Sequence, residues 1–149
     1  HGGGQERRLR PGTLPVALIA AFGHAALLAR ENHAQRNDLC AKEKKRARNA
    51  LRNLAYRENG DAAATVPWMM NLSFAGVDSE AAMVALKGTA AASNGAACTS
   101  NDYGYSHVLQ AMALPDDRVR GAIRFSWSHL TGLVPWEQIA AQLEVLQSS

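Results

Sequence analysis

The sequence predicts an α+β fold, in which a small sheet is covered by helices. Segments with helical and with alternating periodicity follow one another along the 149 residues in the order helices, strand, helix, strand, helix, strand, helix. Apolar residues make up 47% of the chain, which is enough for one domain with a hydrophobic core. The sequence contains no internal repeat and no low-complexity linker, so we expect the helices to pack on a single sheet.

A glycine-rich loop and a buried helix are predicted first. Three glycines and a Pro-Gly pair favour a loop over residues 2–12. Thr13 is suited to cap the following helix, because its hydroxyl can accept from free N–H groups, and Pro15 fits a first helical turn. Apolar residues recur at helical spacing over residues 18–29, which predicts a buried helix to about Arg30.

A second helix with a basic face is predicted from about Ala34 to Leu54. Lysines and arginines crowd one face between Lys42 and Arg52, and the apolar face is thin. Such a run is typical of a solvated helix face. An acidic partner would also suit a chain of formal net charge +3 and isoelectric point near 9.1. No aromatic residues lie among these charges, so direct binding to nucleic acid is not expected.

The rest of the chain predicts strands separated by short helices, after a turn at residues 59–61. Residues 70–74 alternate apolar and polar, as a half-buried strand does. A helix is expected from Asp78 or Ser79 to Lys87, where Gly88 stops it. The remaining elements are a strand and then a loop over residues 89–97, a helix over 103–112, an alternating strand over 122–127 and a last helix that Pro135 opens.

Two cysteines, Cys40 and Cys98, are not arranged as metal ligands. They lie far apart in no Cys-x-x-Cys or paired Cys/His pattern, and the histidines show no ligand spacing, so no metal is expected. No signal peptide is visible, and the longest apolar stretch, residues 14–22, is too short to span a bilayer. We therefore expect a cytoplasmic protein with reduced thiols and no membrane partner.

Cys98 lies among small and polar residues. The segment from Asn94 to Ser100 has little bulk, so its thiol can be exposed on a loop that moves. An exposed, mobile thiol suits sulfur transfer, because it must reach a substrate and then deliver its sulfur. Composition alone favours a semi-buried structural cysteine, so the choice between these interpretations depends on the wider pattern.

Four motifs in this order resemble the NifS/IscS-type cysteine desulfurases. The first is the glycine-rich signature GGGQER and RPGTLP within residues 2–15, and the second is NLSF at residues 71–74. The third joins SNGAACTS at residues 93–100 to YSHVLQAM at 105–112, and the fourth is IRFS at 123–126. Together they cover nearly the whole chain. The longer loop and the Ala-Cys-Thr-Ser context point to the IscS/NifS group.

The resemblance implies the C-terminal part of a fold-type I transferase that depends on pyridoxal 5′-phosphate. Residues 1–13 would be a glycine-rich loop from the end of the cofactor-binding large domain, and residues 14–149 the small domain with the cysteine loop. It further implies that Cys98 is the nucleophile that takes sulfur from L-cysteine, releasing alanine. Arg124 would grip the substrate carboxylate. Thr13 would contact the cofactor phosphate of the neighbouring subunit in a homodimer.

The cofactor lysine that the resemblance implies cannot be placed in this sequence. The lysines, which are Lys42, Lys44, Lys45 and Lys87, lie in the wrong context. We therefore expect the cofactor lysine outside this chain, and the chain alone to be inactive. The abrupt start at His1 also suggests a part of a longer protein. Arg8 stands where the family pattern usually has glycine, so the resemblance does not fix the backbone course of that loop.

The sequence does not identify the sulfur acceptor, and it leaves two alternative functions to be considered. An iron–sulfur scaffold, tRNA thiolation and DNA phosphorothioation are candidate destinations, and divergence at Trp68 and at Ser128-His129 favours the last, a DndA-like branch. A second hypothesis is a non-catalytic module that docks a sulfur acceptor or a DNA-modifying complex through the basic helix. A third is a selenocysteine lyase or an aminotransferase of the same fold. Cys98 argues against an aminotransferase, which needs no loop thiol.

Overall fold

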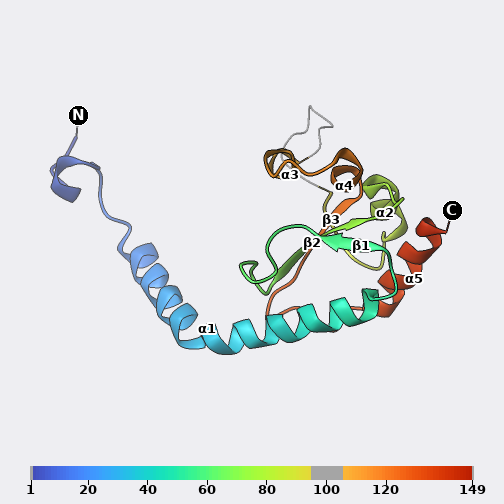
Figure 1. The fold of residues 1–149 in the computed structure, drawn as a ribbon. Coiled ribbons are helices and arrows are strands. Elements are labelled where there is room, and N and C mark those ends of the chain that lie inside the picture. The colour runs from blue at the N-terminus through green and yellow to red at the C-terminus, as the bar shows by residue number, and fades with distance from the viewer. Residues whose placement is uncertain (1, 95–105, 149) are drawn as a thin grey trace. The chain divides into compact units, whose positions relative to one another are not determined.

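The computed structural model describes residues 2–94 and 106–148. The chain divides into two units, His1–Gln35 and Arg36–Ser149 (Figure 1). The first unit holds a 3-10 helix, Glu6–Arg8, and the beginning of α1, which runs over Val16–Leu51. The second unit holds the end of α1 and every other described element, including a three-stranded sheet.

In the first unit, α1 leaves its apolar side chains exposed. Leu18 is 70% and Phe22 is 78% exposed, so the prediction of a buried helix is wrong here, because periodicity reports an apolar face and not what covers it. The preceding loop passes through left-handed conformations, with φ of 55° at Arg7 and 67° at Arg8. Side chains other than glycine rarely adopt them, so Arg8 occupies a backbone conformation that suits the glycine expected there.

The predicted break between two N-terminal helices is absent, since α1 is one helix of 36 residues. No proline or glycine lies between Arg30 and Ala34. Asn32, a residue that often ends helices, instead donates its side-chain amide to the Leu28 carbonyl at 2.8 Å within the helix. The thin apolar face predicted further along is confirmed, because Ala47 and Leu51 are fully buried in the second unit.

The sheet is antiparallel, with strand order β1-β2-β3. The strands are β1 (Tyr56–Glu58), β2 (Met69–Phe74) and β3 (Ala122–Ser126). The two longer strands confirm the alternation in the sequence. The strand β1 was not predicted, because three residues are too few to show a period of two. Of the strand predicted within residues 89–97, the described part forms only an isolated bridge at Ser93.

Four helices follow α1 in the described part of the chain. They are α2 (Ser79–Ala85), α3 (His107–Ala111), α4 (Asp116–Arg120) and α5 (Trp136–Gln147). Asp78 caps α2 as predicted, accepting from the N–H groups of Glu80 and Ala81 at 3.0 and 3.1 Å. Of the helix predicted over residues 103–112, residues 103–105 lie outside the described residues, and α3 forms the part from His107 to Ala111. The helix α4 was not predicted, because its five residues are mostly charged.

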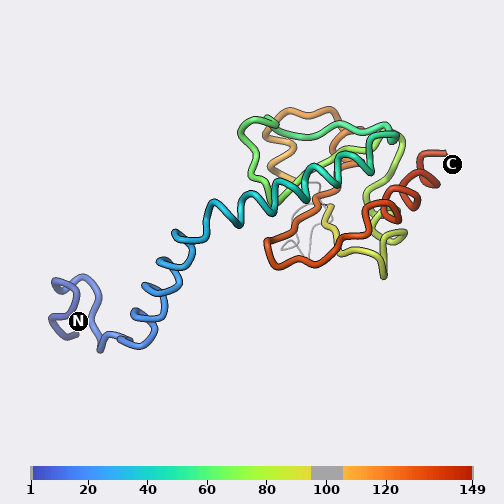
Figure 2. Tube along the Cα trace, turned by 90° about the horizontal axis from the view of Figure 1, so that it is seen from below, coloured from blue at the N-terminus to red at the C-terminus, as the bar shows by residue number. Residues whose placement is uncertain are grey.

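The sheet has one apolar and one polar face. The main core lies between the apolar face, with Leu72, Phe74 and Ile123, and the end of α1, α2 and α5. In the view from below, the teal end of α1 crosses in front of the strands (Figure 2). A smaller cluster, Leu109, Val119 and Ala122, attaches α3 and α4 to the other face. The rest of that face is where polar side chains of the sheet gather.

Candidate active site

Arg124 stands in the middle of β3 on the polar face of the sheet. Its neighbours Ile123 and Phe125 are buried, whereas Arg124 and Ser126 are exposed, as the alternation predicted. Burial of the apolar neighbours fixes the side to which Arg124 points. Within the described segments the guanidinium takes part in none of the ion pairs. The strand therefore presents a cation on its exposed face that can bind a carboxylate.

The chain segment that leads to Cys98 is bonded to Arg124 itself. The Arg124 N–H donates to the Ser93 carbonyl at 2.7 Å, and the Ser93 N–H donates to the Arg124 carbonyl at 3.1 Å. On its other side, Arg124 pairs with Asn71 of β2. Cys98 itself lies outside the described residues. Ser93, five positions earlier in the sequence, is thus anchored at the predicted substrate-binding arginine.

Thr13 belongs to the first unit. It does not cap α1, because the helix begins at Val16 and the Ile19 N–H donates to the Pro15 carbonyl at 3.0 Å; the predicted cap is wrong. Arg10 donates to the carbonyls of Gly12 and Thr13 at 3.4 and 3.5 Å, so it supports this loop. The exposed Thr13 hydroxyl is of the right chemistry for a phosphate oxygen.

A polar network that the sequence analysis missed lies beside Arg124. The Asn59 side-chain amide donates to Asn71 Oδ1 and to Ser73 Oγ, both at 2.7 Å, and Ser73 Oγ donates to the Arg118 carbonyl at 2.6 Å. These bonds connect β2 to the turn after β1 and to α4. Asn71, to which the sequence assigns no catalytic role, is therefore engaged within the sheet. No local signal could have found this network, because it joins residues up to 59 positions apart.

Cys40 and the lysines do not offer alternative reactive groups. Cys40 is 4% exposed, and burial raises the pKa of its thiol. Lys44 Nζ is buried against Glu58 at 3.3 Å and Thr65 Oγ1 at 3.0 Å, so it cannot hold a cofactor covalently. Lys42 pairs with Asp38 on the surface of α1 at 2.6 Å. That the cofactor lysine lies outside this chain stays a prediction.

No group of three or more His, Cys, Asp or Glu side chains in the described ranges could hold a metal ion. Within residues 2–94 and 106–148, no helix has the length and apolar character that crossing a membrane requires.

The chain is similar in sequence to proteins named cysteine desulfurase IscS. It is 40% identical over 132 residues to the one from Vibrio cholerae serotype O1, a match that covers 88% of this chain and 32% of the relative. It is 36% identical over 150 residues to the one from Cronobacter sakazakii, covering 100% of this chain and 36% of the relative. The chain thus spans about a third of the length of these relatives. No family model matches the sequence.

Solved structures show the same similarity. DndA from Streptomyces lividans is 40% identical, with a TM-score of 0.63, and the match covers 85% of this chain and 36% of that one. A structure named NIFS-like protein is 26% identical, with a TM-score of 0.70 over 99% of this chain and 37% of that one. These matches confirm the predicted α+β fold and place it in the C-terminal part of NifS-like proteins of the aminotransferase fold.

Proposed function

We propose that this chain, which belongs to the NifS/IscS-like family of cysteine desulfurases, forms part of an enzyme that moves sulfur from L-cysteine to Cys98. The observation that carries the proposal is the pair of backbone hydrogen bonds between Ser93 and Arg124. Cys98 lies five positions after Ser93, so chain length alone keeps their Cα atoms within about 18 Å. A thiol tethered at that distance can meet a substrate whose carboxylate Arg124 holds.

Arg124, Cys98 and Thr13 would each have a separate role in the reaction. The Arg124 guanidinium would hold the substrate carboxylate through two parallel hydrogen bonds and so orient the cysteine. The Cys98 thiolate would attack the substrate sulfur, forming an S–S bond as the substrate C–S bond breaks and alanine leaves after protonation. Bound pyridoxal 5′-phosphate would supply the electron sink that makes this C–S bond labile. Its phosphate would contact Thr13.

The rest of the enzyme is proposed to lie in a longer protein. The cofactor lysine would come from outside this chain, and the chain alone would be inactive. Residues 1–13 would end the cofactor-binding domain and residues 14–149 would form the small domain, in a cytoplasmic homodimer. The equal identity of 40% to a relative named IscS and to a structure named DndA supports two destinations for the sulfur, iron–sulfur cluster assembly and DNA phosphorothioation. tRNA thiolation stays a third candidate.

A sulfur-labelling experiment tests the proposal, with Cys40 as an internal control. The full-length protein that contains this chain is loaded with cofactor and given L-cysteine, and persulfides are then located by peptide mass spectrometry. We expect one added sulfur on the peptide that contains Cys98 and none on the one that contains Cys40, whose buried thiol is poorly ionised. Absence of sulfur on Cys98 would favour a docking module, in which the basic helix binds an acceptor.

Arg124→Ala is expected to weaken substrate binding without disturbing the cofactor. Loss of a bidentate contact to the carboxylate should raise KM for cysteine by about 10–100-fold. The cofactor absorbance band should persist, because Arg124 is exposed on the strand. Steady-state kinetics and the absorbance spectrum measure the two effects separately.

Two matched variants make this prediction specific. Arg124→Lys should give an intermediate KM, because the lysine ammonium keeps the positive charge but cannot form the two parallel hydrogen bonds. Lys45→Ala, which removes an exposed charge from α1, should leave KM unchanged. Loss of the cofactor band in Arg124→Ala would instead assign Arg124 a structural role.

A further inference from the structure

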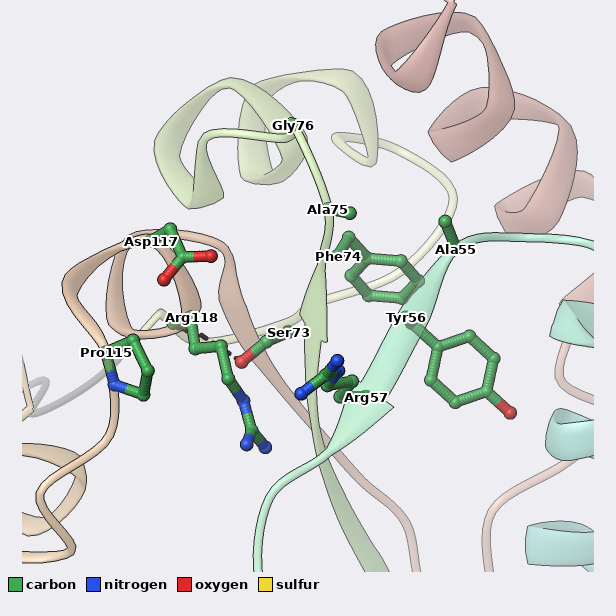
Figure 3. A pocket seen from close by; sticks show the side chains of 10 residues that line it. All are labelled: Ala55, Tyr56, Arg57, Ser73, Phe74, Ala75, Gly76, Pro115, Asp117 and Arg118. Carbon is green, nitrogen blue, oxygen red and sulfur yellow. Dashed lines mark hydrogen bonds between the residues drawn. The ribbon is translucent and has the colours of Figure 1, made fainter.

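A pocket of about 400 Å³ opens between the edge strand β1, the end of β2 and α4 (Figure 3). We name it the arginine pocket, after Arg57 and Arg118, which line it together with Ser73 and Asp117. The function proposed above uses none of these residues.

Strand register brings the two arginines to one opening. Arg57 pairs directly with Ser73 across β1 and β2, and directly opposed residues point to the same side of a sheet. Ser73 Oγ donates to the Arg118 carbonyl at 2.6 Å, which fixes α4 over that side. In Figure 3 both guanidinium groups reach into the same space from their two elements. The rings of Tyr56 and Phe74 lie on the other side of the strands.

The positive charge in the arginine pocket is not neutralised by the described residues. The ion pairs among them use the carboxylates of Asp38, Glu43 and Glu58, and none involves Arg57 or Arg118. Asp117 also lines the pocket, but in Figure 3 its carboxylate stands apart from both guanidinium groups. A net positive charge therefore remains where the two arginines converge.

Arg118 is held in place and keeps donors to spare. Its Nη2 donates to the Asn59 side-chain oxygen and, at 3.4 Å, to the Glu58 carbonyl, both neutral acceptors. Its Nε is buried and has no acceptor in the described part of the chain. A buried donor without an acceptor is unfavourable. Arg118 is thus positioned by neutral groups, with its charge directed at the pocket rather than at an acidic side chain.

We infer that the arginine pocket binds a phosphate or sulfate group. Arg57 can match two oxygens of such an anion with parallel hydrogen bonds, and Arg118 can add a donor from Nη1, because its Nη2 already donates to Asn59 and Glu58. A tetrahedral dianion offers enough oxygens for Arg57 and Arg118 together, whereas a carboxylate has only the two that one guanidinium requires. The site needs neither Cys98 nor the cofactor, so it stands independently of the desulfurase function.

Calorimetric titration with sodium phosphate tests the inference. The protein in its natural length is titrated at low ionic strength, against sodium chloride of equal ionic strength, at a pH where phosphate is a dianion. We expect saturable binding at one site and a dissociation constant about tenfold or more higher in Arg57→Gln, since one charged hydrogen-bonding partner is lost. Sulfate should compete with phosphate, and acetate should compete much less.

Three variants separate the site from general attraction to a basic protein. Lys45→Gln removes the same charge from an exposed position on α1 and should bind phosphate as the wild type does. Arg118→Gln should weaken binding like Arg57→Gln, and Arg118→Lys less so. Because Arg118 also bonds to Asn59, its variants are checked for folding by circular dichroism. Arg57 makes no ion pair with a described residue, so Arg57→Gln should fold normally. This variant decides the result if the Arg118 variants unfold.

The results either support or overturn the site. Saturable binding that Arg57→Gln weakens and Lys45→Gln leaves intact supports it. Binding that does not saturate, that chloride reproduces, or that both variants weaken equally overturns it. Persulfide formation on Cys98 is measured on the same preparations. Phosphate binding without a persulfide would contradict the desulfurase function alone, and a persulfide without phosphate binding would contradict the arginine pocket alone.

Discussion

Cys98→Ser is expected to lower cysteine-dependent alanine release by about 10³-fold or more in the full-length protein, because it removes the proposed nucleophile. A serine hydroxyl is of similar size but is almost wholly protonated at neutral pH, so it cannot accept the substrate sulfur. Cofactor absorbance should remain, since the substitution leaves Arg124 and Thr13 in place. Alanine and sulfide are measured over time at saturating cysteine.

Cys40→Ala is the matched control for this prediction. Cys40 packs in the main core and Trp127 Nε1 donates to its carbonyl at 3.1 Å, a bond that does not need the thiol. We expect normal alanine release and a loss of about 1 kcal/mol in the free energy of unfolding from the small cavity. If Cys98→Ser released alanine and sulfide at the wild-type rate, Cys98 would not be the sulfur acceptor.

The elements that the sequence predicted are those whose pattern is local. The strands β2 and β3 alternate over five or six residues, and Pro135 marks the start of α5. The misses have physical reasons. The strand β1 is too short to show a period, and the two predicted N-terminal helices are one helix because no helix-breaking residue lies between them. Periodicity in residues 18–29 revealed an apolar face without revealing what it contacts.

Only those residues of the candidate site that belong to a sequence motif could be predicted. Arg124 stands on the polar face because Ile123 and Phe125 must be buried, which the alternation already indicates. Its attachment to Ser93 joins residues 31 positions apart in the numbering and follows from strand pairing alone. Arg118 illustrates the same limit: in the sequence it is one charge among several in a short charged segment, and only the fold sets it opposite Arg57.

Gly121→Ala is expected to lower the free energy of unfolding strongly, because a methyl group at Gly121 has no room. A Cβ on Gly121 would lie 2.6 Å from the Phe74 carbonyl oxygen and 2.9 Å from that of Val77. Both are backbone atoms that cannot rotate away. The Phe74 N–H also donates to the Gly121 carbonyl at 3.0 Å, so relief of the clash would pull on β2. We expect a loss of about 3 kcal/mol.

Gly132→Ala provides the comparison, since no atom lies within 4 Å of a Cβ at Gly132 and the position is exposed. Its free energy of unfolding should stay within about 0.5 kcal/mol of the wild type. Urea titrations followed by the fluorescence of the buried Trp127 and Trp136 measure both variants. Similar midpoints for the two would refute the close packing at Gly121. Because Gly121 immediately precedes β3, its alanine variant should also displace Arg124 and raise KM for cysteine, although Arg124 itself is unchanged.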